Sequence, residues 1–276
     1  MRILACQVEI PATDSREQQL VHIHTLITKL DGILADNKVD LVLLPELATM
    51  EYSTENFKQI DCFAEPLEGA SQQLFAELCR KHQVAVCYGM PRLDEDEYYI
   101  SQVVLDRDGE YLTHYDKIHT AEYGDSAELK YFKRGDHLAV FELDGVKAGI
   151  IICYDMRFPE LSRRLCCEFE ADVILHPVAF AQDCSFHSWQ QFVVSRALEN
   201  QVYFVSLNRG GPHFGHSVIC PPWIDESVKP TVMGEAEEFC IVEVDRQHTD
   251  QVRATIPFRK DALQSYQVLP VRSSKS

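Results

Sequence analysis

Three polar residues that could act together in nucleophilic catalysis each lie at the end of an apolar strand or a hairpin. Glu46 follows "DLVLLP", Lys117 follows "YLTHYD" and Cys153 follows "VKAGIII". Ligand sites of α/β proteins form at the carboxyl ends of strands, so we expect these three side chains to meet there. The cysteine is a candidate nucleophile, because a following helix start and a nearby cation would favour its thiolate.

These three residue types suit acyl transfer. A carboxylate beside the thiol could take its proton and later activate water. A lysine could stabilise the oxyanion of a tetrahedral intermediate, together with the backbone N–H of Tyr154. Taken singly, each residue has a plainer explanation. A cysteine at a strand end is usually a small buried hydrophobe, and a single glutamate or lysine is usually a surface charge.

The other cysteines and the histidines suggest no competing site. The ten cysteines show no Cys-x-x-Cys spacing, so we predict no metal site. A papain-type hydrolase would need a histidine base, for which the sequence offers no recognisable motif, and the histidines are interpreted as structural. Several cysteines lie inside apolar strands, which indicates buried free thiols and a reduced, cytoplasmic compartment.

Helices and strands that would position these residues alternate along the chain. Apolar residues at helical spacing predict a first helix behind a capping box of Asp14 and Glu17. Asp108-Gly109 and Asp144-Gly145 predict two hairpins. Further strands are predicted over 40–44, 84–90, 172–177 and 202–207, with short strands up to 244. Further helices are predicted after Ser71, from Pro159 and over 185–199. The long segment over 118–137 is predicted to be a functional loop.

This order of elements predicts an α/β fold. No linker, composition break or tandem repeat divides the chain, so we expect one domain over residues 1–271 and a disordered tail over 272–276. Hairpins mixed with βα units indicate a sandwich with mixed sheets. The number of layers stays open at this point.

Charge and hydropathy argue against several classes of partner. The formal net charge of −17 argues against nucleic acid and against an anionic membrane surface. No apolar run reaches the length of a membrane span. The segment over residues 1–9 turns polar too early for a signal peptide and is interpreted as a first strand.

Three segments resemble the signature segments of a known family. "LVLLPEL", "YDKIHT" and "GIIICYDMRFPELSRRL" are similar, in order and spacing, to those of the nitrilase or carbon–nitrogen hydrolase superfamily. The resemblance continues through "HPVAF", "HSWQQFVVSRALENQVYFVSLN", "FGHSVICPPW" and "RATIPFRKDAL". It therefore covers nearly the whole chain.

The resemblance implies a fold, an assembly and a catalytic set. The fold is a four-layer αββα sandwich, which pairs into a homodimer or a higher homo-oligomer. The implied catalytic residues are Glu46, Lys117 and Cys153, with no metal and no organic cofactor. Many members add a second glutamate, for which Glu128 in "AELKYFKRGD" is the matching position and Glu122 the competing one.

The resemblance also implies a substrate class, a small non-peptide amide. "CYDMRFPE" is similar to the Nit and ω-amidase branch, which favours an amidase acting on an ω-amide of a dicarboxylic acid. "ELKYFKRGD" is more similar to hydrolases of N-carbamoyl amines and amino acids, which is the alternative. A catalytically inactive binding protein is a third possibility, but the presence of all three catalytic residues argues against it.

Three residues are candidates for binding the substrate: Tyr154, Arg157 and Phe180. Arg157 lies four positions beyond the nucleophile, and its guanidinium suits a carboxylate clamp. Its alternative role is an ion pair with Glu160, Asp155 or another nearby carboxylate. Relatives often show Gly-Ala-Phe where this chain has Val-Ala-Phe at 178–180, and Pro-Trp-Gly where it has Pro-Trp-Ile at 222–224. These departures bear on substrate identity.

Overall fold

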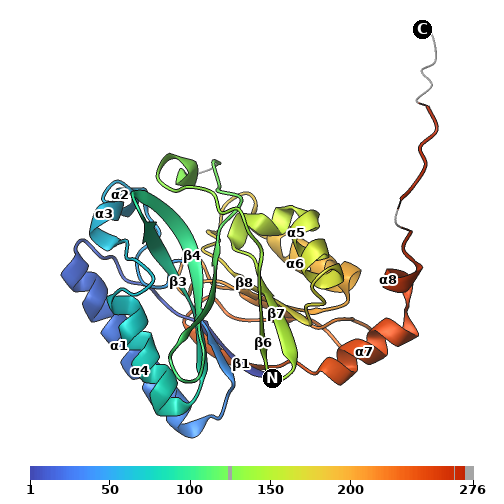
Figure 1. Ribbon diagram of the computed structural model, residues 1–276, viewed down its shortest axis with the longest axis horizontal. Helices are drawn as coiled ribbons and strands as arrows, with labels where there is room; N and C mark the ends of the chain where they lie inside the picture. Colours follow the sequence, from blue (N-terminus) through green and yellow to red (C-terminus); the bar gives the residue numbers. More distant parts are fainter. Residues whose placement is uncertain (124–125, 264, 271–276) are drawn as a thin grey trace.

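Two six-stranded sheets pack face to face between two layers of helices (Figure 1). The computed structural model describes residues 1–123, 126–263 and 265–270. Helices α1 (Arg16–Asp36) and α4 (Ala70–His82) cover one sheet, and α5 (Pro159–Cys167) and α6 (Phe186–Asn200) cover the other. The predicted αββα sandwich with mixed sheets is therefore confirmed.

The first sheet has the order β12-β1-β2-β3-β4-β5. Its centre is parallel from β1 to β3, and the remaining pairs are antiparallel. Two short helices, α2 (Thr54–Phe57) and α3 (Ile60–Phe63), follow the second strand. The strand bounds are β1 (Arg2–Gln7), β2 (Leu41–Leu43), β3 (Ala85–Asp94), β4 (Glu97–Leu105), β5 (Tyr111–Asp116) and β12 (Glu238–Glu243).

The second sheet has the order β11-β10-β9-β8-β7-β6 and is parallel from β7 to β9. Two turns of 3-10 helix, η1 (Glu128–Lys130) and η2 (Cys153–Arg157), belong to the loops before and within it. The strand bounds are β6 (Ala139–Leu143), β7 (Val146–Ile150), β8 (Val173–Pro177), β9 (Tyr203–Leu207), β10 (Val218–Cys220) and β11 (Thr231–Val232).

Strand β2 is apolar throughout because both of its faces are buried. Leu41 and Leu43 belong to the apolar cluster that also contains Ile150 of the second sheet. Val42, between them, belongs to the cluster beneath α1 and α4. Alternate side chains of a strand point to opposite faces, so one short run of apolar residues fills two layers of the core.

Two predictions about local structure are wrong. Ser15 is the N-cap of α1 and accepts from the Gln18 backbone N–H at 3.3 Å, so Asp14 and Glu17 do not form the predicted capping box. The segment after β12 also contains α7 (Arg246–Thr255) and α8 (Phe258–Asp261), which are absent from the predicted elements because these segments contain few apolar residues.

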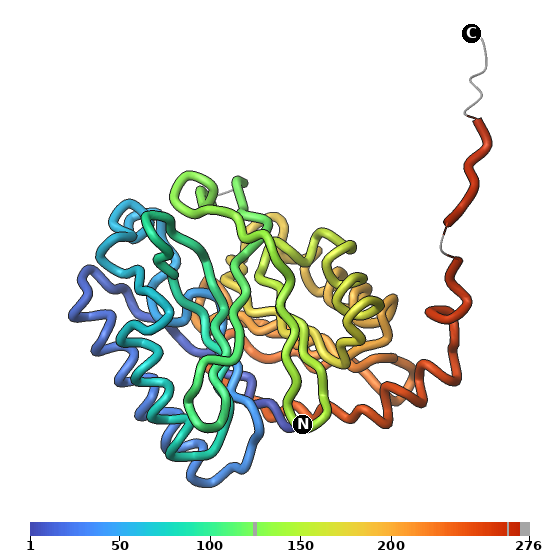
Figure 2. Tube along the Cα trace, in the orientation of Figure 1, coloured from blue at the N-terminus to red at the C-terminus, as the bar shows by residue number. Residues whose placement is uncertain are grey.

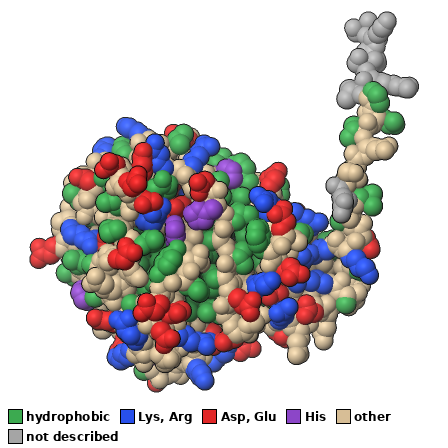
Figure 3. Space-filling view, viewed as in Figure 1, with side chains coloured by type: hydrophobic (Ala, Val, Ile, Leu, Met, Phe, Trp, Pro, Cys, Tyr) green, Lys and Arg blue, Asp and Glu red, His purple; other side chains and the backbone are tan. Residues whose placement is uncertain are grey.

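Beyond α8, the last described residues extend away from both sheets (Figure 2). Their apolar side chains at Leu263, Tyr266, Val268 and Leu269 are 65–87% exposed. The tail predicted to be disordered, 272–276, lies outside the described residues. On the face in Figure 3, acidic and basic side chains are interspersed, so the excess negative charge is not gathered into one patch there.

The loop after β2 is buried from Leu44 to Met50 and lies directly on β3. The backbone N–H of Leu44 donates to the Cys87 carbonyl oxygen at 2.9 Å, and the backbone N–H of Thr49 donates to the Gly89 carbonyl oxygen at 3.2 Å. A Cβ atom at Gly89 would lie 2.4 Å from the Pro45 carbonyl oxygen and 2.5 Å from the Leu47 nitrogen. Only glycine fits here, because the neighbouring atoms are backbone.

We predict that Gly89→Ala lowers the free energy of unfolding by about 1–3 kcal/mol, because the added methyl group must displace this loop. Gly32→Ala is the matched control: Gly32 lies in α1 with no atom within 4 Å of the new Cβ, so this change is expected to stabilise the protein slightly. Urea unfolding measures both. Equal stability of the two variants would contradict the close approach.

Candidate active site

The structure brings the four predicted catalytic residues together from both sheets. Glu46 lies in the loop after β2, Lys117 directly follows β5, and Glu128 begins η1. Lys117 Nζ donates to Glu46 Oε1 and to Glu128 Oε1, each at 2.8 Å, and all three side chains are fully buried. Cys153 begins η2, beyond β7 of the second sheet, and lines a cavity together with residues that bind the two carboxylates, Tyr52, Ala121 and Ala179.

Each carboxylate of the cluster has further donors. The Ala179 backbone N–H donates to Glu46 Oε2 at 2.7 Å. The Tyr52 hydroxyl donates to Glu128 Oε1 at 2.5 Å, and the Ala121 backbone N–H donates to Glu128 Oε2 at 2.7 Å. Glu122, the competing candidate for the second glutamate, is exposed and takes no part in this network.

Lys117 remains an ammonium in this environment. Burial alone would lower the pKa of Lys117, but the carboxylates of Glu128 and Glu46 outweigh it and hold the pKa well above the usual value. Burial raises the pKa of Glu128, and the Lys117 charge opposes that rise. An ammonium has three N–H donors, of which two point to carboxylates, so one remains for another acceptor.

Cys153 adopts a backbone conformation that is unusual for a residue other than glycine. The strand was expected to continue up to the cysteine, but β7 ends at Ile150, and Cys153 has a positive φ of 44°. Such strain is held only where the surroundings impose it, and it is frequent at active sites. The His176 ring accordingly lies 2.9 Å from the Cys153 carbonyl oxygen.

A buried carboxylate, Asp155, holds the turn that carries the nucleophile. Its oxygens accept from the Ile152 backbone N–H at 3.1 Å, from the Tyr115 hydroxyl at 2.7 Å and from the His119 backbone N–H at 2.8 Å. The donors come from three segments of the chain, so the turn is fixed by tertiary contacts.

The Cys153 thiol is not pre-ionised, contrary to the expectation that a cation and a helix start would favour the thiolate. Burial and the Glu46 carboxylate raise the pKa of Cys153 well above its usual value, and Lys117 offsets only part of this rise. The helix that begins at Cys153 is a single 3-10 turn and supplies little dipole. The thiol therefore needs a base, and Glu46 is the carboxylate with the largest effect on it.

The cavity at Cys153 has a volume of about 240 Å³, which suits a small molecule. Four of its lining side chains are aromatic, and Cys153 is among the other lining residues. The lining residues are Tyr52, Ser53, Thr54, Ala121, Tyr123, Ser126, Cys153, Ala179, Phe180, Ala181, Asp183 and Phe214.

The three predicted substrate-binding residues lie at different depths around this cavity. Phe180 lines it and stacks on Trp189 with ring centroids 5.3 Å apart. Tyr154 is half-buried, with its ring 5.3 Å from that of Tyr123. Arg157 lies behind the wall, with its guanidinium carbon 5.8 Å from the ring centroids of both Tyr123 and Phe180.

The predicted ion pair of Arg157 does not occur with any carboxylate in the described ranges. The carboxylate of Asp155 is occupied by the donors named above, and Glu160 is exposed at the start of α5. Four aromatic rings surround the guanidinium of Arg157 instead, at 5.3–5.9 Å.

Comparison with known proteins identifies the family. Residues 2–254 match the sequence model of the Carbon-nitrogen hydrolase family. The chain belongs to the carbon–nitrogen hydrolase family. It is therefore a hydrolase of carbon–nitrogen bonds in non-peptide amides.

Among relatives of this carbon–nitrogen hydrolase, a 2-oxoglutaramate amidase of Bacillus subtilis is 30% identical, over 80% of this chain and 84% of its own. The ω-amidase NIT2-B of Xenopus laevis is 27% identical, over 84% and 86%. The crystal structure of Nit3 from Saccharomyces cerevisiae shares the fold with a TM-score of 0.80 and 24% identity, over 93% of this chain and 94% of the other.

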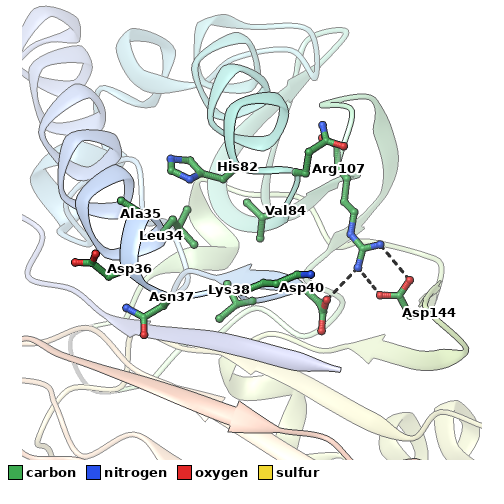
Figure 4. Close-up of a pocket in the computed structure, with 12 residues that line it drawn as sticks. Leu34, Ala35, Asp36, Asn37, Lys38, Asp40, His82, Val84, Arg107 and Asp144 are labelled. Carbon is green, nitrogen blue, oxygen red and sulfur yellow. Dashed lines mark hydrogen bonds and ion pairs between the residues drawn. The ribbon is translucent and has the colours of Figure 1, made fainter.

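A larger cavity of about 720 Å³ lies at the opposite ends of the same strands (Figure 4). It is lined by residues that precede β2 and β7, whereas the candidate site is built from residues that follow them. Arg107 spans this hollow and pairs with Asp40 at 3.1 Å and with Asp144. This arrangement ties the two sheets together, and the cavity contains no thiol, so it is not a candidate for the hydrolase site.

Several residues of the site could not be found from the sequence. Tyr52 lies six positions beyond Glu46 yet binds Glu128, and Ala179 contributes only its backbone N–H. Neither contact leaves a local pattern. In the part of the chain that the structure describes, no group of three or more His, Cys, Asp or Glu side chains could hold a metal ion. No described helix is long and apolar enough to cross a membrane.

We predict that Glu46→Gln slows alkylation of Cys153 by iodoacetamide on the order of 10²-fold at neutral pH, because the loss of the base outweighs the loss of the negative charge that raises the pKa of the thiol. Three exposed free thiols, Cys62, Cys167 and Cys184, are internal controls whose labelling should not change. Peptide mass spectrometry after brief labelling follows all four together. Unchanged labelling of Cys153 in the variant would mean that Glu46 is not its base.

Proposed function

We propose that this carbon–nitrogen hydrolase is an amidase that cleaves a small amide through a thioester on Cys153, with an ω-amide of a dicarboxylic acid as the favoured substrate. The observation that carries the proposal is the buried ammonium of Lys117 between Glu46 and Glu128, together with a small cavity that Cys153 lines. The cavity volume of about 240 Å³ favours a small acyl group over a polypeptide.

The first half-reaction forms the thioester. Glu46 takes the thiol proton while the Cys153 sulfur attacks the amide carbonyl carbon. The remaining N–H of Lys117 and the backbone N–H of Tyr154 stabilise the oxyanion. When the tetrahedral intermediate collapses, the C–N bond breaks, the nitrogen receives the proton from Glu46, and ammonia leaves.

The second half-reaction releases the acid. Glu46 takes a proton from a water molecule, whose oxygen attacks the thioester carbonyl, and the proton then returns to sulfur as the C–S bond breaks. Lys117 stabilises the same oxyanion as before. Glu128 does not exchange protons in this scheme: its role is to hold the Lys117 ammonium in place.

The choice of an ω-amide rests on relatives and on charge. Relatives named as 2-oxoglutaramate amidase and ω-amidase are 30% and 27% identical to this chain. The net charge of −17 is unfavourable for an anionic substrate unless a local cation receives it. Arg157 lies just behind Tyr123 and Phe180, and from there its charge acts on a carboxylate placed against that wall.

We also propose one domain over residues 1–271 and a homodimer or higher homo-oligomer. Apolar side chains such as Tyr266 and Leu269 are exposed in the single chain, and association of chains would bury such side chains. Light scattering would test the assembly, and a mass of one chain would contradict it.

Release of ammonia from a panel of small amides tests the function. We expect activity on ω-amides of dicarboxylic acids and its loss in Cys153→Ala, with wild-type activity in Cys184→Ala, whose thiol is exposed. The same panel includes N-carbamoyl amines and N-carbamoyl amino acids. If only these compounds are hydrolysed, with release of both ammonia and CO2, the protein is an N-carbamoyl hydrolase and not an ω-amidase. No ammonia from either class would overturn the proposal.

A second prediction concerns Arg157. Arg157→Met should raise KM for ω-amides of dicarboxylic acids by about tenfold, equivalent to about 1.4 kcal/mol, because the carboxylate loses its nearest cation. Arg157→Lys, which keeps the charge, should recover part of this loss. Neutral amides of the same size are the control. If KM rises equally for both substrate classes, Arg157 supports the wall of the cavity and does not select the carboxylate.

A further inference from the structure

Arg209 joins the second sheet to the loop that carries Glu46. It follows β9, and its side chain is buried. Its Nη2 donates to the carbonyl oxygens of Glu46 at 3.0 Å, Leu47 at 2.8 Å and Met50 at 2.9 Å, and Nε donates to Glu46 O at 3.3 Å. One guanidinium therefore binds three carbonyls of the loop.

The loop held in this way is strained. Leu47 has a positive φ of 48°, and its carbonyl is one of the three that Arg209 binds. On the other side of the loop, the His22 ring of α1 lies 2.9 Å from the Ala48 carbonyl oxygen. Contacts from two sides fix the backbone of the residue next to Glu46, and with it the direction in which the carboxylate points.

The charge of Arg209 is not used by an ion pair within the described ranges. Its guanidinium carbon lies 5.8 Å from the Tyr52 ring and 5.9 Å from the Phe214 ring, both of which line the cavity. Burial lowers the pKa of Arg209 to about 10, and the nearby Glu46 carboxylate opposes that fall, so the side chain stays charged at neutral pH.

The catalytic cluster lacks one positive charge without Arg209. When Glu46 and Glu128 are both ionised, the single ammonium of Lys117 leaves one formal negative charge in a fully buried site. An unpaired buried charge is costly, and a second cation at this depth offsets that cost.

We propose that Arg209 is a positioning residue, which directs Glu46 through its loop and supplies the second positive charge of the buried cluster. The inference rests on the proposed function in that Glu46 is the base. Several titratable or charged groups face Arg209 or the cluster. They include His22 of α1, Glu46, Glu51 and Tyr52 of the loop after β2, Tyr115 of β5, Lys117 after β5, Tyr123, Glu128 of η1, Cys153 of η2 and His176 of β8.

The pH dependence of kcat/KM and of Cys153 alkylation tests the proposal. Arg209→Met should move the acidic limb of both profiles upward by about one pH unit, because loss of a cation disfavours the charged forms of the cluster and of the thiol. Arg253→Met is the control, since Arg253 of α7 also binds a backbone carbonyl, that of Ala171 at 3.1 Å, away from the cavity.

Arg209→Lys separates geometry from charge. It should keep the acidic limb at the wild-type pH but lower kcat about tenfold or more, because a compact ammonium cannot bind three carbonyls as a guanidinium does. If Arg209→Met folds and its acidic limb lies at the same pH as that of the wild type, the proposal is overturned. If that variant does not fold, wild-type kcat in Arg209→Lys would overturn it instead. Alkylation needs no substrate, so this readout stands even if the wild type hydrolyses no amide.

Discussion

A buried ammonium between two buried carboxylates is the interaction on which the site depends. Removing a lysine from water costs several kcal/mol, and this cost is offset only when each charge keeps its hydrogen-bonding partners. Lys117 has Glu46 and Glu128 at 2.8 Å, and those carboxylates have Ala179, Tyr52 and Ala121 as further donors. Each charged group of the cluster depends on partners from other segments of the chain, so the segments that carry these residues must meet with little freedom.

That requirement explains why the site lies at the junction of the two sheets. Glu46 and Lys117 follow strands of the first sheet, whereas Cys153 and Ala179 follow strands of the second. The bond from the Ala179 N–H to Glu46 crosses between the sheets, as does the contact of Arg209 with the Glu46 loop. The packing of the two sheets therefore sets the distance between base and nucleophile.

Local signals in the sequence predicted the strands that carry the catalytic residues, but not the long-range contacts that set their conformation and charge. The strands and the hairpin that end at Glu46, Lys117 and Cys153 could be recognised because strand and turn patterns are local. The positive φ of Cys153 and the aromatic surroundings of Arg157 depend on segments far apart in the sequence. The same holds for the ionisation of the thiol. A helix start and a nearby cation suggested a thiolate, but burial and the Glu46 carboxylate raise the pKa of Cys153.

The central claim is that the acyl group passes through Cys153. The most direct measurement is to quench the wild-type enzyme in acid during turnover of an ω-amide and to determine by peptide mass spectrometry which residue is acylated. The account predicts an acyl group on the Cys153 peptide, and its removal by hydroxylamine, as expected of a thioester. Turnover with the acyl group on another residue, or undiminished turnover in Cys153→Ala, would contradict it.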